Sequence, residues 1–440
     1  MTSPEIKNPP SSLIEKFKFL GPGFILSASI VGSGELIATT VLGAEGGFIT
    51  FWVILVSCLI KVAIQLEFGK NAIVTGKPLM NSFSILPGPK NWAVWSTFLL
   101  TIFKIVQLGG MIGGAAIALN MLMPQLSPIL LAFILGAITS LLIYRNYYKI
   151  VERTSMLMVF GFTIFTLASV IAVSYSPYAF TLTDVLSGLT FDLPSNLIFV
   201  AIGAFGITGV ASDEIIAYTY WCLEKGYAKS TGENDGTEEW KTRAKGWIKI
   251  MYLDAFVAMF IYTIVTSAFY LLGASILYGN ETIPNGNQLI EKLANIYTQT
   301  LGEDARLAYI TGAFFVLFSS VFATLAYWTR LFPDIFGELG WINYENQKTR
   351  KNWVAILAWT LPILWAIAFA FVKLPAFMVL SGGVVGSVLL LLVVYAAIQF
   401  RVKNNTLNLT SGIFSKVMFW LSVVSIGLVS IYGIIKLFWF

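Results

Sequence analysis

The chain has 440 residues, of which 57% are hydrophobic and only 12% are charged, with a net charge of +5. Its mean hydropathy is +0.78, which excludes a soluble domain of this length and indicates an integral membrane protein. Histidine is absent and there are two cysteines, which excludes histidine ligands or proton relays and argues against a disulfide framework.

Eleven apolar segments are long enough to cross a bilayer, since a helical span needs about 20 apolar residues. We therefore predict an all-α integral membrane protein that forms one polytopic domain over residues 1–440. The predicted spans are 19–42, 48–68, 93–122, 127–144, 155–176, 196–221, 248–273, 307–330, 353–372, 376–400 and 417–438.

The positions of the basic residues predict the orientation of the chain. With a cytoplasmic N-terminus, most of the 28 Lys and Arg residues fall in the inner loops, as the positive-inside rule requires. An odd number of spans then places the C-terminus outside. We expect a multi-pass protein of the plasma (inner) membrane whose partners are the lipid bilayer and a transported solute. The basic residues need no nucleic acid to explain them, and no obligate protein partner is evident.

A ten-residue segment occurs twice in the chain. Val31–Thr40, in the first span, matches Val210–Thr219, in the sixth, at six of ten positions. Both copies carry a glutamate inside an apolar segment, at Glu35 and Glu214. Corresponding interrupted helices in the two halves are typical of inverted-repeat transporters, where they meet near the membrane midplane around the substrate.

Glycines accompany both copies and predict where the two helices break. Each glycine weakens a helix by about 1 kcal/mol relative to alanine, and unwound backbone survives in a membrane only where it lines a protein cavity. We predict breaks at Gly32-Ser33-Gly34 in the first span and around Gly203, Gly206 and Gly209 in the sixth. The alternative is that these glycines only let helices pack closely.

The carboxylates beside these breaks are the predicted cation ligands. A charge at the bilayer centre costs about 2.5–3.5 kcal/mol on insertion scales, so it commonly marks a pathway or binding site. We predict that Glu35, Asp213 and Glu214 bind a metal ion. An oxygen-only donor set suits a hard divalent cation of the Mg²⁺ or Mn²⁺ class. The remaining predicted binding residues are Val31, Gly32, Ser33, Gly34, Val210, Ala211 and Ser212.

Two lysines lie inside predicted spans. Lys104, which is near Gln107, could supply a positive charge for coupling. Lys61 is expected to extend its long side chain to the interface. In an alternative interpretation, Glu35 and Glu214 form ion pairs with these lysines and only hold the helices together.

With these features in view, the chain resembles the natural-resistance-associated macrophage protein (Nramp) family of divalent metal transporters, within the LeuT-type superfamily. The resemblance implies eleven spans, with interrupted helices one and six and a metal site between them. It also implies a five-plus-five inverted repeat over 19–176 and 196–400, followed by an extra helix at 417–438. The segments that carry the resemblance are Gly21-Pro22-Gly23-Phe24, Ile73-Val74-Thr75-Gly76 and Ala116-Ile117-Ala118-Leu119-Asn120.

The chain departs from this family at its ligand motifs. The family's Asp-Pro-Gly-Asn falls on Gly32–Glu35, and its Met-Pro-His-Asn falls by internal symmetry on Ala211–Glu214, or on Ile207–Val210 without a gap. Loss of the methionine removes the soft ligand that favours transition metals. Leu108 and Met111 stand where family members carry acidic residues in the third span, which affects the usual proton route.

We therefore expect a secondary transporter, not an enzyme, that moves a divalent cation by alternating access. It needs no cofactor besides the transported ion, and protons are a candidate second ion. The alternative is a Na⁺- or H⁺-coupled carrier of a small organic solute such as an amino acid, because fold does not dictate substrate. A channel or a purely structural membrane protein fits the repeat and the broken helices less well.

Overall fold

The computed structural model describes residues 6–32, 34–145, 148–279, 303–407, 409 and 412–439, and every regular element in these ranges is helical. The elements that form the apolar body are α2 (Pro22–Ile30), a π-helical segment (Gly34–Thr39), α3 (Thr40–Gly46), α4 (Phe51–Thr75), α6 (Trp92–Phe103), α7 (Ile105–Leu122), α8 (Pro128–Ile143), α9 (Tyr148–Val173), α11 (Ile198–Ile207), α12 (Ser212–Lys225), α14 (Glu238–Leu277), α16 (Glu303–Glu338), α17 (Gln347–Val372), α18 (Pro375–Thr406) and α19 (Ile413–Trp439). The shorter connecting helices are α1 (Leu13–Phe17), α5 (Leu79–Ser84), α10 (Leu182–Ser187) and α13 (Tyr227–Thr231), with a 3₁₀ turn at Ser195–Leu197.

The described part contains nine helical segments that are long and apolar enough to cross a membrane. A tenth arises when α2 and the segment Gly34–Gly46, bent by 41° relative to each other, are counted as one span. The predicted span at 127–144 is the 16-residue helix α8. An all-α, multi-pass membrane protein is thus confirmed, whereas the count of eleven spans stays a prediction.

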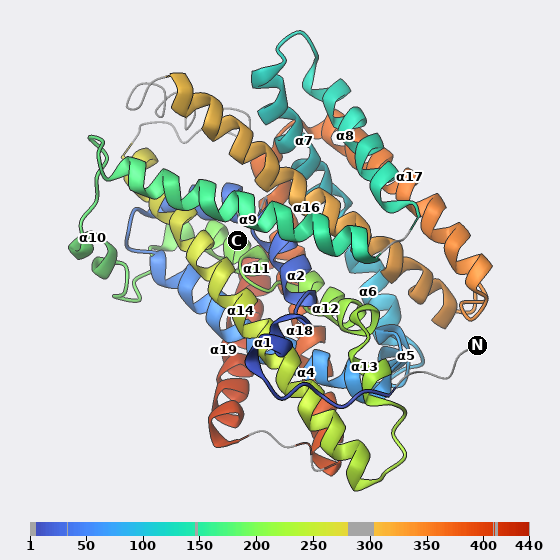
Figure 1. Ribbon diagram of the computed structural model, residues 1–440. Coiled ribbons are helices and arrows are strands. Elements are labelled where there is room, and N and C mark those ends of the chain that lie inside the picture. The colour runs from blue at the N-terminus through green and yellow to red at the C-terminus, as the bar shows by residue number, and fades with distance from the viewer. Residues whose placement is uncertain are drawn as a thin grey trace.

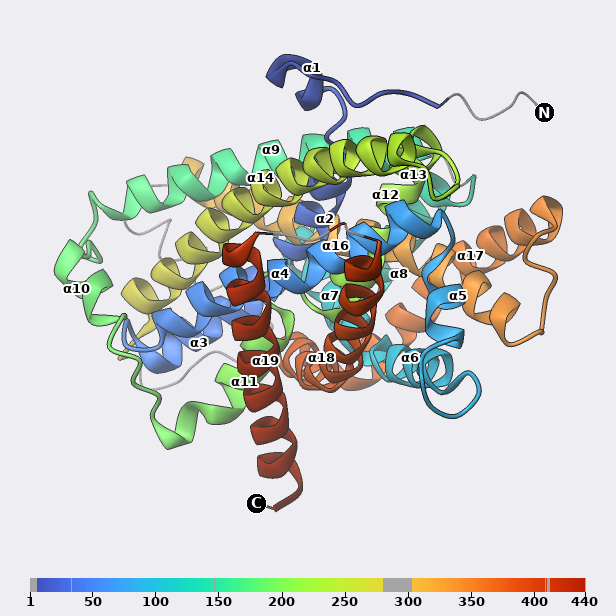
Figure 2. The ribbon, with the colours of Figure 1, turned by 90° about the horizontal axis from the view of Figure 1, so that it is seen from below.

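The helices cross one another at many angles instead of forming a parallel bundle (Figure 1). In the view of Figure 2, α1 and the end of α19 lie on opposite sides of the molecule. This placement is compatible with an odd number of crossings. Which side is cytoplasmic stays a prediction.

Helices from the two predicted repeats pack against each other. α14, from the second repeat, packs on α3 and α4 of the first, and α16 and α18 pack on α7. Within the second half, α11 lies against α18. The apolar core is therefore shared by the two halves, and each broken helix is surrounded by elements from both.

The start of the first broken helix is fastened to α14. The backbone amides of Gly21 and Gly23 donate to the two carboxylate oxygens of Asp254, at 2.8 and 2.7 Å. These bonds satisfy amides that the first turn of a helix leaves without partners. The Tyr218 hydroxyl, on α12, donates to the same carboxylate at 2.9 Å. One buried side chain thereby holds together α2, α12 and α14.

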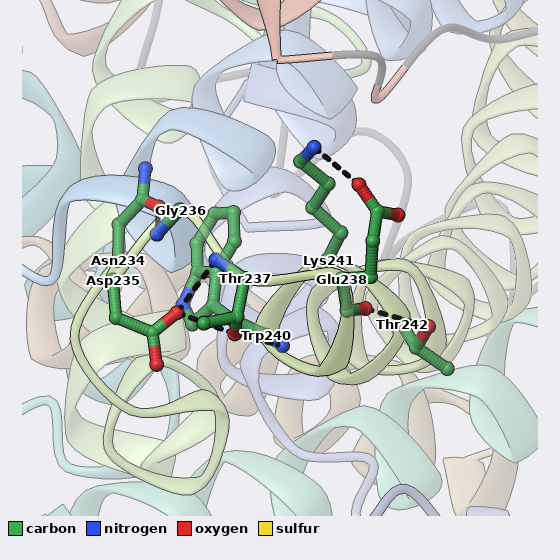
Figure 3. Close-up of polar contacts among 8 residues, drawn as sticks. All are labelled: Asn234, Asp235, Gly236, Thr237, Glu238, Trp240, Lys241 and Thr242. Carbon is green, nitrogen blue, oxygen red and sulfur yellow. Dashed lines mark hydrogen bonds and ion pairs between the residues drawn. The ribbon is translucent and has the colours of Figure 1, made fainter.

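The 40-residue helix α14 begins in a polar loop, shown in Figure 3. Thr237 accepts a hydrogen bond from the Trp240 amide at 3.1 Å, which is the contact that an N-cap residue supplies. The Asp235 carboxylate accepts from the Thr237 amide and hydroxyl, at 2.9 and 2.6 Å. The hydroxyl bond, followed by the amide bond, lowers the pKa of Asp235 below its usual range. Local polar contacts thus set the start of this helix.

Candidate functional site

The first predicted break is present in the described residues. α2 ends at Ile30, the chain turns at Val31 and Gly32, and helical structure resumes as the π-helical segment Gly34–Thr39. A Cβ on Gly32 would lie 1.6 Å from the Ser320 Oγ of α16, so only glycine fits this approach. π-Helical turns are rare and frequently occur at functional sites. Ser33, a predicted binding residue, lies outside the described residues.

The second break lies between α11 and α12, where Thr208–Ala211 are not helical. Gly209 has φ +61°, and a Cβ there would lie 2.8 Å from the Cys58 Cα of α4. Both the backbone conformation and the close approach therefore require glycine. The ungapped register of the second motif, Ile207–Val210, falls largely on this break. The symmetric register places Ser212–Glu214 in the first turn of α12.

The other two glycines of the sixth span have a different role. Gly203 and Gly206 lie inside the intact helix α11. A Cβ on Gly206 would lie only 2.0 Å from the carbonyl oxygen of Gly383, on α18. Close helix packing thus explains Gly206, and of the three glycines around which the break is predicted, only Gly209 lies in it.

The two breaks are in contact, and each glutamate hydrogen-bonds to the opposite broken helix. Glu35 Oε1 accepts from the Gly209 amide at 3.0 Å, and Glu214 Oε1 accepts from the Ser29 hydroxyl at 3.0 Å. Glu35 is fully buried. The structure therefore holds each glutamate against the opposite broken helix, through hydrogen bonds that run in both directions between the breaks.

Asp213 has a different partner. Its Oδ2 forms a buried ion pair with Lys104, a residue that ends α6 and precedes α7. Within the described ranges, neither glutamate forms an ion pair with a lysine, so the interpretation of Glu35 and Glu214 as salt-bridge partners of the two lysines is wrong. Nor do the described residues include a group of three or more Asp, Glu, Cys or His side chains arranged to hold a metal ion. The three-carboxylate ligand set stays a prediction.

Several buried oxygen atoms near the breaks have no hydrogen-bond partner among the described residues. They include Glu35 Oε2, Ser212 Oγ, Asp213 Oδ1, Glu214 Oε2 and Gln107 Oε1. Gln107 packs against α18, where a Cβ on Gly382 would lie 2.4 Å from its Oε1. Buried polar atoms are nearly always satisfied in folded proteins, and exceptions call for a ligand, an ion or water. These oxygen atoms favour a site for a cation or a polar solute.

Lys61 lies at the second break. Its side chain is fully buried, and its Nζ donates to the carbonyl oxygens of Phe205 and Thr208, the latter at 2.9 Å. The expectation that Lys61 extends to the membrane interface is therefore wrong. The carbonyls that the break leaves open provide acceptors inside the protein, so the ammonium group has no need to reach water.

Sequence reasoning missed two further contributors. The Ser57 hydroxyl lies within hydrogen-bond distance of the carbonyl oxygens of Phe205 and Thr208, and the Ser29 hydroxyl donates to Glu214. Ser57 and Lys61 are four residues apart on α4, a spacing that places both on one helix face, and this polar pair could have been noticed. Ser29 is one of two serines in the apolar helix α2, and nothing in the sequence distinguishes it from Ser27.

Comparison with known sequences gives a consistent result along the chain. The profile of the family "Natural resistance-associated macrophage protein-like" (Nramp) matches residues 23–436. The "Divalent metal cation transporter MntH" of Caldanaerobacter subterraneus subsp. tengcongensis is 27% identical over 299 residues, which cover 65% of this chain and 66% of that protein. The protein of the same name from Mesorhizobium japonicum is 24% identical over a match that covers 63% of this chain and 59% of that protein. The chain thus spans somewhat less than two thirds of these relatives.

Solved structures show the same fold at low sequence identity. A mutant of the manganese transporter of Eremococcus coleocola superposes with a TM-score of 0.71 at 15% identity, covering 99% of this chain and 90% of that one. MhsT in complex with L-phenylalanine superposes with a TM-score of 0.58 at 15% identity, covering 96% and 99%. Both likenesses bear on the fold alone and confirm the predicted LeuT-type architecture.

Proposed function

The chain belongs to the natural-resistance-associated macrophage protein-like family, whose members are transporters and not enzymes, and we propose that it carries a divalent metal cation across the membrane by alternating access. The names of the MntH relatives support this substrate class. The multi-pass helical body with two interrupted helices supports a carrier.

The observation that carries the proposal is the contact between the two breaks. Glu35 and Glu214 come from equivalent positions in the two halves, and each is held by a hydrogen bond from the opposite broken helix. Mg²⁺ is commonly bound through one or two carboxylates together with water. In our proposal these two side chains are the primary ligands, and the backbone of Val31–Gly34 and Val210–Ala211 completes the site.

Asp213 joins the site only when Lys104 releases it. In the described state the ammonium group of Lys104 neutralises this carboxylate, while the second oxygen of Asp213 and the Ser212 hydroxyl have no partner among the described residues. A divalent cation attracts Asp213 more strongly than a monovalent ammonium group does, because the Coulomb energy scales with charge. We propose that cation binding displaces Lys104, and that Gln107 lies close enough on α7 to receive it.

The preferred ion in this proposal is hard. The chain contains no histidine, and the donors at the breaks are carboxylate, hydroxyl and carbonyl oxygens. Such donors favour Mg²⁺, Ca²⁺ and Mn²⁺ over ions that prefer sulfur or imidazole.

A specific observation also favours the second candidate, a coupled carrier of an organic solute. Two buried ammonium groups, on Lys61 and Lys104, lie beside the breaks, and the described residues offer no group of three metal-ligating side chains. In this candidate function the carboxylate of the solute pairs with the Lys104 ammonium group in place of Asp213. In this case Glu35 or Glu214 carries the coupling proton.

Uptake into proteoliposomes separates the two candidates. Mn²⁺, Mg²⁺ and Ca²⁺ are offered to the wild type and to a Glu35→Gln, Glu214→Gln double variant, with a pH-sensitive dye inside. We expect the wild type to take up at least one divalent ion and the double variant to take up none. Glu45→Gln, on α3 of the same broken span, is the matched control and retains uptake. Retained uptake in the double variant contradicts the proposal, and competition by amino acids but not by metal ions favours the organic solute.

A further inference from the structure

The end of α11 presents two carbonyl oxygens to an ammonium group instead of to another helix. The last carbonyls of a helix have no partner within it, and the break after Ile207 leaves those of Phe205 and Thr208 available. Both accept from Lys61 Nζ. Ser57 Oγ lies within hydrogen-bond distance of the same two oxygens, at 3.2 and 3.0 Å. The ammonium group also lies 4.4 Å from the centre of the Phe205 ring.

The hydrogen bonds of Lys61 are those of a cation held by neutral oxygen atoms. Within the described residues Lys61 forms no ion pair, and its side chain is fully buried in a membrane-spanning helix. A lysine in this position is costly unless carbonyls or charges compensate for lost water. In carriers with interrupted helices, unwound carbonyls and half-helix C-terminal ends bind small cations, and aromatic faces attract them as well. Lys61 Nζ has all three kinds of contact.

One peptide unit connects Lys61 to the proposed substrate site. The carbonyl oxygen of Thr208 accepts from Lys61, while the amide of the next residue, Gly209, donates to Glu35. The Thr208–Gly209 peptide therefore lies with its negative end on the ammonium group and its positive end on the carboxylate. Each contact strengthens the other, because neighbouring hydrogen bonds polarise one another in a buried setting.

We propose that the Lys61 ammonium group is a tethered cation. It occupies a monovalent-cation site at the C-terminal end of α11, closes that site to free ions, and positions Glu35 through the Thr208–Gly209 peptide. Occupation of this site by Lys61 does not depend on which substrate the chain carries. Its consequence for transport rests on the function proposed above: divalent uptake requires neither Na⁺ nor K⁺.

Removal of the Lys61 side chain should make the monovalent-cation site available to free cations. Lys61→Ala deletes the side chain beyond Cβ, so that n-propylammonium is the matching free cation. Lys61→Met keeps the length of the stem without its charge and is the matched control. The thermal unfolding midpoint of the purified full-length protein is measured in chloride salts of n-propylammonium, Na⁺, K⁺ and choline at equal ionic strength.

In choline chloride we expect Lys61→Ala to unfold at a lower temperature than the wild type. Addition of n-propylammonium, Na⁺ or K⁺ should raise the midpoint of Lys61→Ala by several degrees, since a ligand that binds only the folded state stabilises it. For the wild type, and likewise for Lys61→Met, the unfolding midpoint should not differ among the four salts. A folded Lys61→Ala protein that responds to none of these cations overturns the proposal, and so does a wild type with an equal response.

Transport provides a second readout. Wild-type Mn²⁺ uptake should be equal in Na⁺, K⁺ and choline. In choline, uptake by Lys61→Ala should be roughly tenfold lower than that of the wild type, which is the scale of one charge-assisted hydrogen bond. It should recover when the cation that stabilises Lys61→Ala is added. If Lys61→Ala does not fold, Lys61→Gln replaces it, because its side-chain amide can still donate to both carbonyls. We expect Lys61→Gln to fold and to show the same loss of uptake. Unchanged uptake by Lys61→Gln overturns the proposal. Wild-type protein without divalent uptake, by contrast, removes the proposed function and leaves the unfolding result standing.

Discussion

The two breaks share a sequence but differ in structure and charge. At the first, helical structure resumes at Gly34 as a π-helical segment, and the carboxylate of Glu35 accepts a hydrogen bond from a backbone amide. At the second, four residues stay unwound, and two lysines lie against it, one on the carbonyls at the end of α11 and one on Asp213. The repeated segment thus sets where the glutamates lie, while residues outside it, on α4 and between α6 and α7, set the charge.

Because of this difference, we assign the two breaks different roles in ion binding. The first break presents a single carboxylate, which accepts a hydrogen bond from the Gly209 amide. The second presents two neighbouring carboxylates, of which one is neutralised in the described state. We therefore expect the first break to hold the ion and the second to respond to it, and the following changes test that division.

The largest effect should come from the Lys104–Asp213 ion pair, which has no counterpart among the described residues of the first break. Lys104→Met leaves a buried carboxylate without its partner, which costs about 3–5 kcal/mol. Adding Asp213→Asn should recover much of this loss, because the uncompensated charge is then removed. The free energy of unfolding, measured by detergent titration for both single variants and the double variant, checks the expectation. A Lys104→Met protein as stable as the wild type would show that the pair does not contribute.

The next largest effect should separate the two glutamates. Glu35→Gln should reduce uptake efficiency about a hundredfold and Glu214→Gln about tenfold, on a scale of 1.5–3 kcal/mol for an interaction with a charged group. The loss is smaller at the second break because Asp213 lies next to Glu214 and can replace it. Initial rates over a range of Mn²⁺ concentrations, with Glu45→Gln as control, measure both values. Equal losses would mean that the breaks are functionally equivalent.

A smaller difference should appear between the glycines of the two breaks. Gly209→Ala places a side chain at φ +61° and 2.8 Å from the Cys58 Cα, and the left-handed conformation alone costs about 1–2 kcal/mol. In Gly34→Ala the nearest atom to the new Cβ is the Ile207 carbonyl oxygen, at 3.2 Å, and the substitution gains helix propensity. Thermal unfolding of the two variants should therefore rank Gly209→Ala as the less stable, and the reverse order would contradict the assignment of the breaks.

The smallest effect is expected far from both breaks, at the start of α14 (Figure 3). Thr237→Ala removes the N-cap contact and should cost about 1 kcal/mol without changing uptake. It should also raise the pKa of Asp235 toward its usual range, because the Thr237 hydroxyl that lowers it is gone. Since that pKa is lowered in the folded state, the stability it provides is present at neutral pH and is lost as the pH falls through the lowered value. Unfolding curves at neutral and acidic pH measure both effects.

The sequence could predict the two breaks and a glutamate beside each of them, because a segment repeated at equivalent positions of the two halves indicates a symmetric architecture. It could not distinguish Gly206 from Gly209, since a glycine that lets helices touch and a glycine at a break look alike without the neighbouring helix. The partners of Lys61 and Asp213 were equally out of reach. They depend on how α4 and the junction of α6 and α7 pack against the second break, and these contacts join residues more than a hundred positions apart.

The most direct test of the central claim, that the two breaks form one divalent-cation site, is anomalous diffraction from crystals of the protein soaked in Mn²⁺. The account predicts an anomalous peak between Glu35 and Glu214, about 2–2.6 Å from a carboxylate oxygen of each. That peak should be lost in Glu35→Gln crystals. A peak elsewhere in the protein, with none between the two breaks, would contradict the account.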